Sequence, residues 1–174
     1  MGDSQAGALS VPWLCALAHA VAEAADLDAA CAAVAQGANT AIGHRLFTVM
    51  RFDAAAMEVQ RLYSSDPAAY PPGVRKAKRD TWWGRHVLEQ GRPYIGRDAD
   101  DIRAHFVDHA IIAGFGLAAI LNVPVRVCGR TVGTMNLLHV AGHYGEQHVP
   151  AGRMLAALLA APLLAWCAAA AGDA

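Results

Sequence analysis

The stretch from Leu117 to His139 constrains the fold most, because it contains two extended runs joined by a tight turn at Cys128-Gly129-Arg130. Side chains alternate between the two faces of a strand. Neither face of the second run, which begins at Thr131, is purely polar. A strand with two such faces is covered on both sides. The sequence therefore predicts a central hairpin that lies between two layers.

Two residues are expected to interrupt the regular pairing of this hairpin. Pro124 has no backbone N–H, so it belongs at a sheet edge, a bulge or a strand break. Gly133 leaves a gap where a side chain would stand, which is common where a ligand or another backbone approaches closely. A bulge with nothing bound explains this glycine equally well.

Length and charge narrow the class of protein. A chain of 174 residues and 18.3 kDa fits one domain, here residues 1–174, with a full core. A net charge of −1, with 17% charged residues, gives no sequence-wide basic field, so we expect no nucleic acid partner. The basic cluster Arg75–Arg79 lies in a predicted loop. Such a cluster either draws an anion towards a nearby pocket or, more often, forms a solvated surface.

Cysteine spacing and apolar segments bear on the compartment. The four cysteines show no CxxC spacing, and no basic-then-apolar leader opens the chain, so the sequence predicts a reducing cytoplasm. The uncharged segment Met154–Ala171 is long enough to raise the question of a membrane span. Its alanine content and Pro162 favour a helix buried against the sheet and a second copy of the chain, so we expect no membrane partner.

Helix caps and turn residues divide the rest of the chain into elements. Four caps are expected: Ser10 for a helix that reaches Ala24, Asp26 for one that ends before Gly43, Asp80 for one over 81–89, and Asp98 for one that Gly114 closes. The other expected elements are strands over 45–52, 57–64 and 93–95, a loop over 64–73, and a last helix over 150–170.

In the central hairpin, Asn122–Val125 has a small or polar residue followed by hydrophobic-Pro-hydrophobic, and Val132–Met135 reads hydrophobic-Gly-x-hydrophobic before an apolar C-terminal helix. This pattern resembles the closing half of a GAF domain. Residues 1–116 resemble the family in the order of their elements only. The resemblance implies an α+β fold with a central antiparallel sheet of about five to six strands. Terminal helices (1–43 and 148–174) would cover one face and form a homodimer, and residues 44–147 would supply the sheet and a ligand pocket on the other face.

Aromatic, imidazole and amide side chains gather on the elements expected around the open face of the sheet. Flat apolar walls with a few hydrogen-bonding groups suit a small organic ligand. Taken alone, either of the two adjacent tryptophans is more simply a core or surface residue. The predicted ligand-binding residues are Tyr63, Trp82, Trp83, His86, Tyr94, His109, Phe115, Asn136 and His139.

Metal and thiol chemistry are the alternatives to simple binding. His105 and His109 stand four apart on a predicted helix, but no Glu or Cys lies at a zinc-motif spacing, so no metal site is expected. One branch of GAF-like proteins reduces free methionine sulfoxide with pocket cysteines, whereas this chain reads Thr81-Trp82-Trp83-Gly84 at the helix start that would carry one. The cyclic-nucleotide signature and the bilin-attachment cysteine of other GAF domains are also missing. No cofactor can be named.

The sequence thus predicts a cytoplasmic GAF-like protein that binds a small organic ligand and signals without catalysis of its own. Ligand contacts from Trp83, His86, His109 and Asn136 would order the loop Tyr63–Gly73 and shift the helix bundle. A thiol- or histidine-dependent enzyme on the same scaffold and a purely structural dimerisation module are the alternatives.

Overall fold

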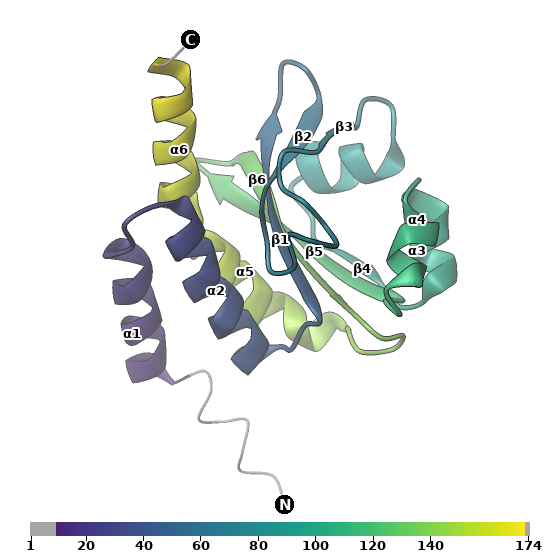
Figure 1. The fold of residues 1–174 in the computed structure, drawn as a ribbon, viewed down its shortest axis with the longest axis horizontal. Helices are drawn as coiled ribbons and strands as arrows, with labels where there is room; N and C mark the ends of the chain where they lie inside the picture. The colour runs from purple at the N-terminus through teal and green to yellow at the C-terminus, as the bar shows by residue number, and fades with distance from the viewer. Residues whose placement is uncertain (1–9, 173–174) are drawn as a thin grey trace, which may run out of the picture.

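The computed structural model describes residues 10–172 and has the predicted α+β architecture, with one six-stranded sheet (Figure 1). The sheet follows the order β3-β2-β1-β6-β5-β4, and every neighbouring pair is antiparallel. The strands are β1 (Leu46–Asp53), β2 (Glu58–Ser64), β3 (Arg75–Ala77), β4 (Tyr94–Gly96), β5 (Ala119–Val127) and β6 (Arg130–His139).

The helices divide between the two faces of the sheet, as predicted. Four of them lie on one side: α1 (Val11–Ala22), α2 (Leu27–Ala41), α5 (Val149–Leu158) and α6 (Ala160–Gly172) (Figure 1). The π-helix η1 (Gly84–Glu89) and the short helices α3 (Ala99–His105) and α4 (His109–Gly114) lie over the other face. A single turn of 3₁₀-helix, η2 (Glu146–His148), leads into α5.

The β5–β6 hairpin lies in the sheet interior, as its two-faced pattern predicts. Cys128 and Gly129 form its turn with φ of 47° and 75°, which matches the twist of the flanking strands. Pro124 is tolerated because the pairing of β5 with β4 stops at Asn122. On that side of β5 no strand pairs with Pro124, so its missing N–H breaks no hydrogen bond to β4. The register of the hairpin shifts between Val125 and Arg126, next to the predicted irregularity.

Alternation along the central strands produces two cores. Phe47, Leu121 and Met135 point towards the terminal helices, where they are fully buried with Val34 and Leu155. The residues next to them in each strand point to the opposite face. There Leu46, Ile120 and Leu138 meet residues of η1, α3 and α4.

Gly133 belongs to the face covered by helices. A Cβ atom there would lie 2.3 Å from the backbone oxygen of Met50 and 2.9 Å from Leu163 of α6. The close approach that the glycine permits is therefore to the backbone of β1 and to α6. The expectation that Gly133 borders a ligand is wrong, because the register of β6 turns it away from the open face.

Helix caps follow the sequence in three places. The side chains of Ser10, Asp26 and Asp98 each accept a backbone hydrogen bond at the start of a helix. Asp80 does not do so, because its φ of 61° lies outside the cap conformation. The hydroxyl of Thr81 accepts from the Gly84 amide at 2.9 Å instead.

Three predicted elements differ from the structure. The basic cluster is only partly a loop: Arg75–Ala77 pairs with β2 as β3, and the last two residues of the cluster follow this strand. The helix expected from Asp98 to Gly114 is divided into α3 and α4, because Phe106 is extended with ψ of 119°. The last helix is interrupted at Leu159, since Pro162 has no amide hydrogen to continue the regular pattern.

By length and composition alone, the helical stretch Glu146–Gly172 could cross a membrane. This is weak evidence, because core helices of soluble proteins meet the same criterion. In this fold Leu155, Leu159 and Leu163 are buried against the sheet.

We predict that Gly133→Ala destabilises the protein by about 1–3 kcal/mol, because the new methyl group must displace β1 or α6. Urea unfolding measures this loss. Gly114→Ala is the control: no described atom lies within 4 Å of the place its methyl group would take, and alanine favours the helix, so stability should change by no more than about 1 kcal/mol. Equal effects of the two variants would contradict the close contact at Gly133.

Candidate functional site

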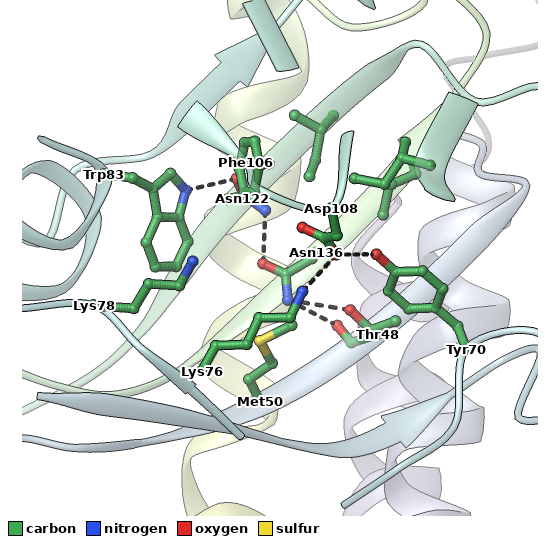
Figure 2. Close-up of a pocket in the computed structure, with 13 residues that line it drawn as sticks. Thr48, Met50, Tyr70, Lys76, Lys78, Trp83, Phe106, Asp108, Asn122 and Asn136 are labelled. Atoms are coloured by element: carbon green, nitrogen blue, oxygen red, sulfur yellow. Dashed lines mark hydrogen bonds and ion pairs between the residues drawn. The ribbon is translucent and has the colours of Figure 1, made fainter. Parts of the chain in front are cut away.

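A small cavity of about 30 Å³ lies against the face of the sheet opposite the terminal helices (Figure 2). Strands β1, β5 and β6 supply its floor, and its walls come from the loop with Tyr70, from β3 and the residue after it, from Trp83 just before η1, and from α4 and the segment before it. Its lining residues are Thr48, Met50, Tyr70, Lys76, Lys78, Trp83, Phe106, Asp108, Ile112, Ile120, Asn122, Asn136 and Leu138.

A chain of buried hydrogen bonds crosses the cavity floor (Figure 2). Asn122 and Asn136 face each other across β5 and β6, and the Asn122 amide donates to the Asn136 oxygen at 2.7 Å. Trp83 Nε1 donates to the Asn122 oxygen at 2.9 Å, and Asn136 donates to the hydroxyl of Thr48 at 3.2 Å. Because an indole N–H can only donate, the orientation of both amides follows from Trp83.

Asp108 joins three separate segments at one wall of the cavity. Its Oδ2 accepts hydrogen bonds from Lys76 of β3 and from the hydroxyl of Tyr70, each at 2.5 Å (Figure 2). Burial raises the pKa of Asp108, but the hydrogen bonds from Lys76 and Tyr70 outweigh burial and hold the pKa below its usual value. The Tyr70 ring is covered by the Arg61 guanidinium at 3.9 Å. We call the contact of Lys76, Tyr70 and Asp108 the Asp108 clasp.

Lys78 is a buried cation without an anionic partner among the described residues. Only 9% of the residue is exposed, and its Nζ lies 4.9 Å from the ring centre of Trp83. Within residues 10–172, no hydrogen bond or ion pair engages this ammonium group. Burial and the nearby charge of Lys76 lower the pKa of Lys78 to about 8. Among the residues that line the cavity, Lys78 is therefore the one cation without an ion pair within residues 10–172; the buried Arg61 lies behind the Tyr70 ring and does not line the cavity.

Two of the predicted site residues line the cavity. Trp83, 3% exposed, forms a wall, and Asn136 forms part of the floor. Tyr63 lies on the other side of the sheet, where it packs edge-on against Phe47 at 6.1 Å. His139 lies outside the cavity and stacks on His143 at 3.7 Å. Alternation along β2 and the register of β6 explain why these last two residues do not reach the cavity.

The other five predicted residues do not line the cavity. Trp82, 44% exposed, is stacked between His86 at 4.6 Å and His105 at 4.4 Å. Tyr94 is buried next to this stack and donates its hydroxyl hydrogen to the Asp101 carbonyl at 3.0 Å. His109 is half-buried at the start of α4, and Phe115 is 45% exposed against the edge of Tyr70. Trp82, His86, Tyr94, His109 and Phe115 therefore lie outside the cavity lining.

Sequence reasoning missed the charged wall of the cavity. Lys76 and Lys78 stand two apart, so a strand directs both side chains to one face, but the local pattern predicts a loop there. On a continuous helix Asp108 would point elsewhere, whereas the break at Phe106 turns it towards β3. Asn122 enters the sequence prediction only as part of the family pattern.

Neither thiols nor a metal cluster belong to the cavity in the described part of the chain. Cys15, Cys31 and Cys167 lie on the helix-covered side and Cys128 in the hairpin turn, so none of these four cysteines lines the cavity. Burial raises the pKa of Cys31 to about 12, which keeps its thiol protonated. Among residues 10–172, no three His, Cys, Asp or Glu side chains come together as metal ligands.

Comparison with known families agrees with this arrangement. The family model described as GAF domain matches residues 18–163, which is most of the chain. The chain belongs to the GAF domain family. No curated protein matches it in sequence.

Solved structures similar to this GAF protein include domains of enzymes and of a chemotaxis protein. The GAF domain of a phosphoenolpyruvate-protein phosphotransferase from Coxiella burnetii is 20% identical, with a TM-score of 0.73 over 91% of this chain and 94% of that chain. A methyl-accepting chemotaxis protein fragment is 16% identical, with a TM-score of 0.64 over 85% of this chain and 94% of that chain.

A free methionine-R-sulfoxide reductase from Neisseria meningitidis, solved with its substrate, is 19% identical, with a TM-score of 0.72 over 97% of this chain and 95% of that chain. At such low identities the likeness shows the shared fold alone. The chemistry of this GAF protein must be argued from its own residues.

We predict that Lys78→Met stabilises the protein at pH 7 by about 1–3 kcal/mol, because an unpaired buried ammonium is replaced by an apolar side chain. The folded-state pKa of Lys78, about 8, lies below its unfolded value. Between about pH 8 and 10.5 the unfolded chain therefore binds more protons, and wild type gains stability relative to the variant.

Urea unfolding of both proteins at pH 7 and pH 10 should show the advantage of Lys78→Met shrinking as the pH rises. Arg75→Met removes a cation from β3, the strand that ends just before Lys78, but this cation is largely exposed and paired with Glu58 at 2.9 Å. Its effect should stay within about 1 kcal/mol at both pH values. A Lys78→Met protein less stable than wild type at pH 7 would show that the charge has a partner.

Proposed function

We propose that this GAF protein is a sensory or regulatory protein that binds a small organic molecule in the cavity and has no catalytic activity of its own. The observation that supports this most is the combination of a buried, oriented polar floor with apolar walls on the open face of the sheet. Binding sites for small molecules have this composition, with few polar groups that fix orientation.

The size of the cavity implies that binding is coupled to movement. A volume of about 30 Å³ holds about two water molecules, so a metabolite fits only if a wall moves. The Asp108 clasp connects the segments best placed to move, namely the loop with Tyr70, the edge strand β3 and the short helix α4. Ligand entry that opens this contact would change the order of the loop over Tyr63–Gly73, which is a route to a signal.

Catalysis draws less support from the residues of the cavity. A reductase of the methionine sulfoxide type needs a thiolate next to the substrate, and the resemblance to such an enzyme is one of fold. No histidine of the described chain lines the cavity either, and this includes His86 and His109. The lining residues offer binding groups rather than a nucleophile paired with a base.

The proposal includes a homodimer formed through the terminal helices, in the cytoplasm and without a nucleic acid or membrane partner. Val11 of α1 and Leu164 of α6 are exposed by 73% and 43%, and a groove of about 750 Å³ lined mainly by alanines runs between the helix pairs. Small apolar side chains permit close helix approach. Four free cysteines suit a reducing compartment.

We predict that a small molecule that raises the melting temperature of the purified protein loses at least about tenfold in affinity on Trp83→Leu. Trp83 forms a wall of the cavity and orients its floor. The adjacent Trp82 lies in the outer stack, so Trp82→Leu is the matched control and should change affinity by less than about threefold. Isothermal titration calorimetry with hits from a thermal-shift screen measures both.

A screen in which no small molecule stabilises the protein would argue against the proposed function. Equal losses for Trp82→Leu and Trp83→Leu would instead move the binding site to the outer stack. Circular dichroism of both variants checks that each remains folded.

For the dimer, we expect Leu164→Asp to weaken self-association by at least about tenfold, because a charge would enter an apolar helix contact. Val107→Asp is the control, since Val107 is 94% exposed but lies between α3 and α4, away from the terminal helices. Sedimentation equilibrium gives the two dissociation constants. Wild-type protein that sediments as a monomer would refute the proposed dimer.

A further inference from the structure

We infer that the ligand of this cavity is a small monocarboxylate with an apolar body, held by its carboxylate at Lys78. This inference rests on the proposed function, since it names the chemical class of the molecule that the cavity takes. Neither the family membership nor the fold specifies that class.

The ionisable side chains at the cavity constrain the charge of the ligand. Four ionisable side chains line it: Tyr70, Lys76, Lys78 and Asp108. The negative charge of Asp108 is paired with Lys76 at 2.5 Å. One positive charge, that of Lys78, remains on a residue that is 9% exposed. A positive charge on a largely buried side chain is costly without a partner, so a single negative charge on the ligand complements the site.

The hydrogen-bonding groups of the cavity floor constrain which polar group of the ligand can lie there. An amide NH₂ group carries two donor hydrogens, and Asn122 uses one of them on Asn136. The oxygens of both asparagines are already accepting, and the Thr48 hydroxyl accepts from Asn136. Among residues 10–172, nothing accepts the second hydrogen of Asn122 or the hydroxyl hydrogen of Thr48. The floor therefore presents donors, which a carboxylate satisfies and an ammonium group does not.

The position of these donors suits one carboxylate. Lys78 Nζ lies 4.9 Å from the ring centre of Trp83, and the same ring donates to Asn122 (Figure 2). Lys78 and Asn122 thus adjoin one aromatic wall. A carboxylate on that wall has two oxygens, one for the ammonium group and one for the amide.

The remaining walls select the rest of the molecule. Met50, Phe106, Ile112, Ile120 and Leu138 are apolar and surround the polar patch. A free amino acid would place an ammonium group beside Lys76 and Lys78, and like charges repel. A phosphate dianion would leave one negative charge unpaired against a site with a single positive charge to offer. An unsubstituted branched or aromatic carboxylic acid meets all of these constraints.

Titration of the full chain with matched probes tests the inference. The probes are benzoate and 3-methylbutanoate, their neutral analogues benzamide and 3-methylbutanamide, the amino acid leucine, and inorganic phosphate, all at equal ionic strength. Binding is followed by calorimetry and by the indole ¹⁵N–H resonance of Trp83, which is assigned with Trp83→Phe. We expect the carboxylates to bind at least about tenfold more tightly than the amides. Leucine and phosphate should not shift the Trp83 resonance.

Variants separate the charge from the shape of the site. Lys78→Met should lower carboxylate affinity at least about tenfold and leave amide affinity within about threefold of wild type. Arg75→Met, which removes an exposed cation of β3, should leave both affinities within about threefold of wild type. The Lys78→Met protein must also retain the wild-type spectrum outside the cavity.

A pH series gives an independent readout. Lys76, Asp108 and Tyr70 are the other ionisable groups at the cavity, and the pKa of Asp108 is lowered while burial raises that of Tyr70. Carboxylate affinity should therefore fall above about pH 8 as Lys78 loses its proton, and amide affinity should not follow that profile.

The outcomes distinguish this inference from the function on which it depends. Amides that bind as well as carboxylates, or carboxylate binding that survives Lys78→Met, would overturn the inference and leave the proposed function in place. Tight binding of leucine or phosphate would overturn it as well. If neither carboxylates nor amides shift the Trp83 resonance, the inference fails, whereas the proposed function fails only if the thermal-shift screen also finds no stabilising molecule.

Discussion

The structure depends on the burial of both faces of strands β1, β5 and β6. Side chains on a strand alternate, so these strands must place one set of residues against the terminal helices and the other set beneath η1, α3 and α4. The helix-covered face is apolar, with Phe47, Leu121 and Met135 in the same layer. The opposite face has polar residues at its centre, and this difference creates the cavity.

Burying polar groups in a sheet is unfavourable unless each finds a partner. Thr48, Asn122 and Asn136 solve this by pairing with one another and with the indole of Trp83. The network fixes the direction of both amides, so the donors it leaves over face the cavity. Among the residues that line the cavity, Lys78 differs because no hydrogen bond or ion pair within residues 10–172 engages its ammonium group. A stability-optimised core would not keep such a residue, and functional sites are where such exceptions concentrate.

Much of the fold could be predicted because its signals are local. The Gly129 turn, the Ser10, Asp26 and Asp98 caps and the apolar helices each follow from a short run of residues. The residues that line the cavity are harder to predict from the sequence, because they depend on which distant segments of the chain lie next to one another in the fold. Trp83 and Asn136 do line the cavity, whereas no local signal separates them from Tyr63 and His139, which do not.

The missed residues show what a single sequence does not contain. Lys76 and Lys78 read as a solvated basic run until β3 is known to pair with β2, and only then does alternation bring both to one side. Asp108 is 32 residues from its partner Lys76, so nothing near it in the sequence announces the contact. The split between α3 and α4 is equally hidden, since the pattern of Ile102 and Phe106 suits a continuous helix.

The Asp108 clasp has a consequence for how this side of the molecule moves. A single carboxylate oxygen accepts from both Lys76 and Tyr70, so β3 and the loop before it share one anchor at the start of α4. Displacing α4 removes both contacts in one event, although β3 remains paired with β2. Opening at the start of α4 is thus coupled to opening of the loop that carries Tyr70, and amide exchange in these two segments, distant in sequence, should proceed at a common rate.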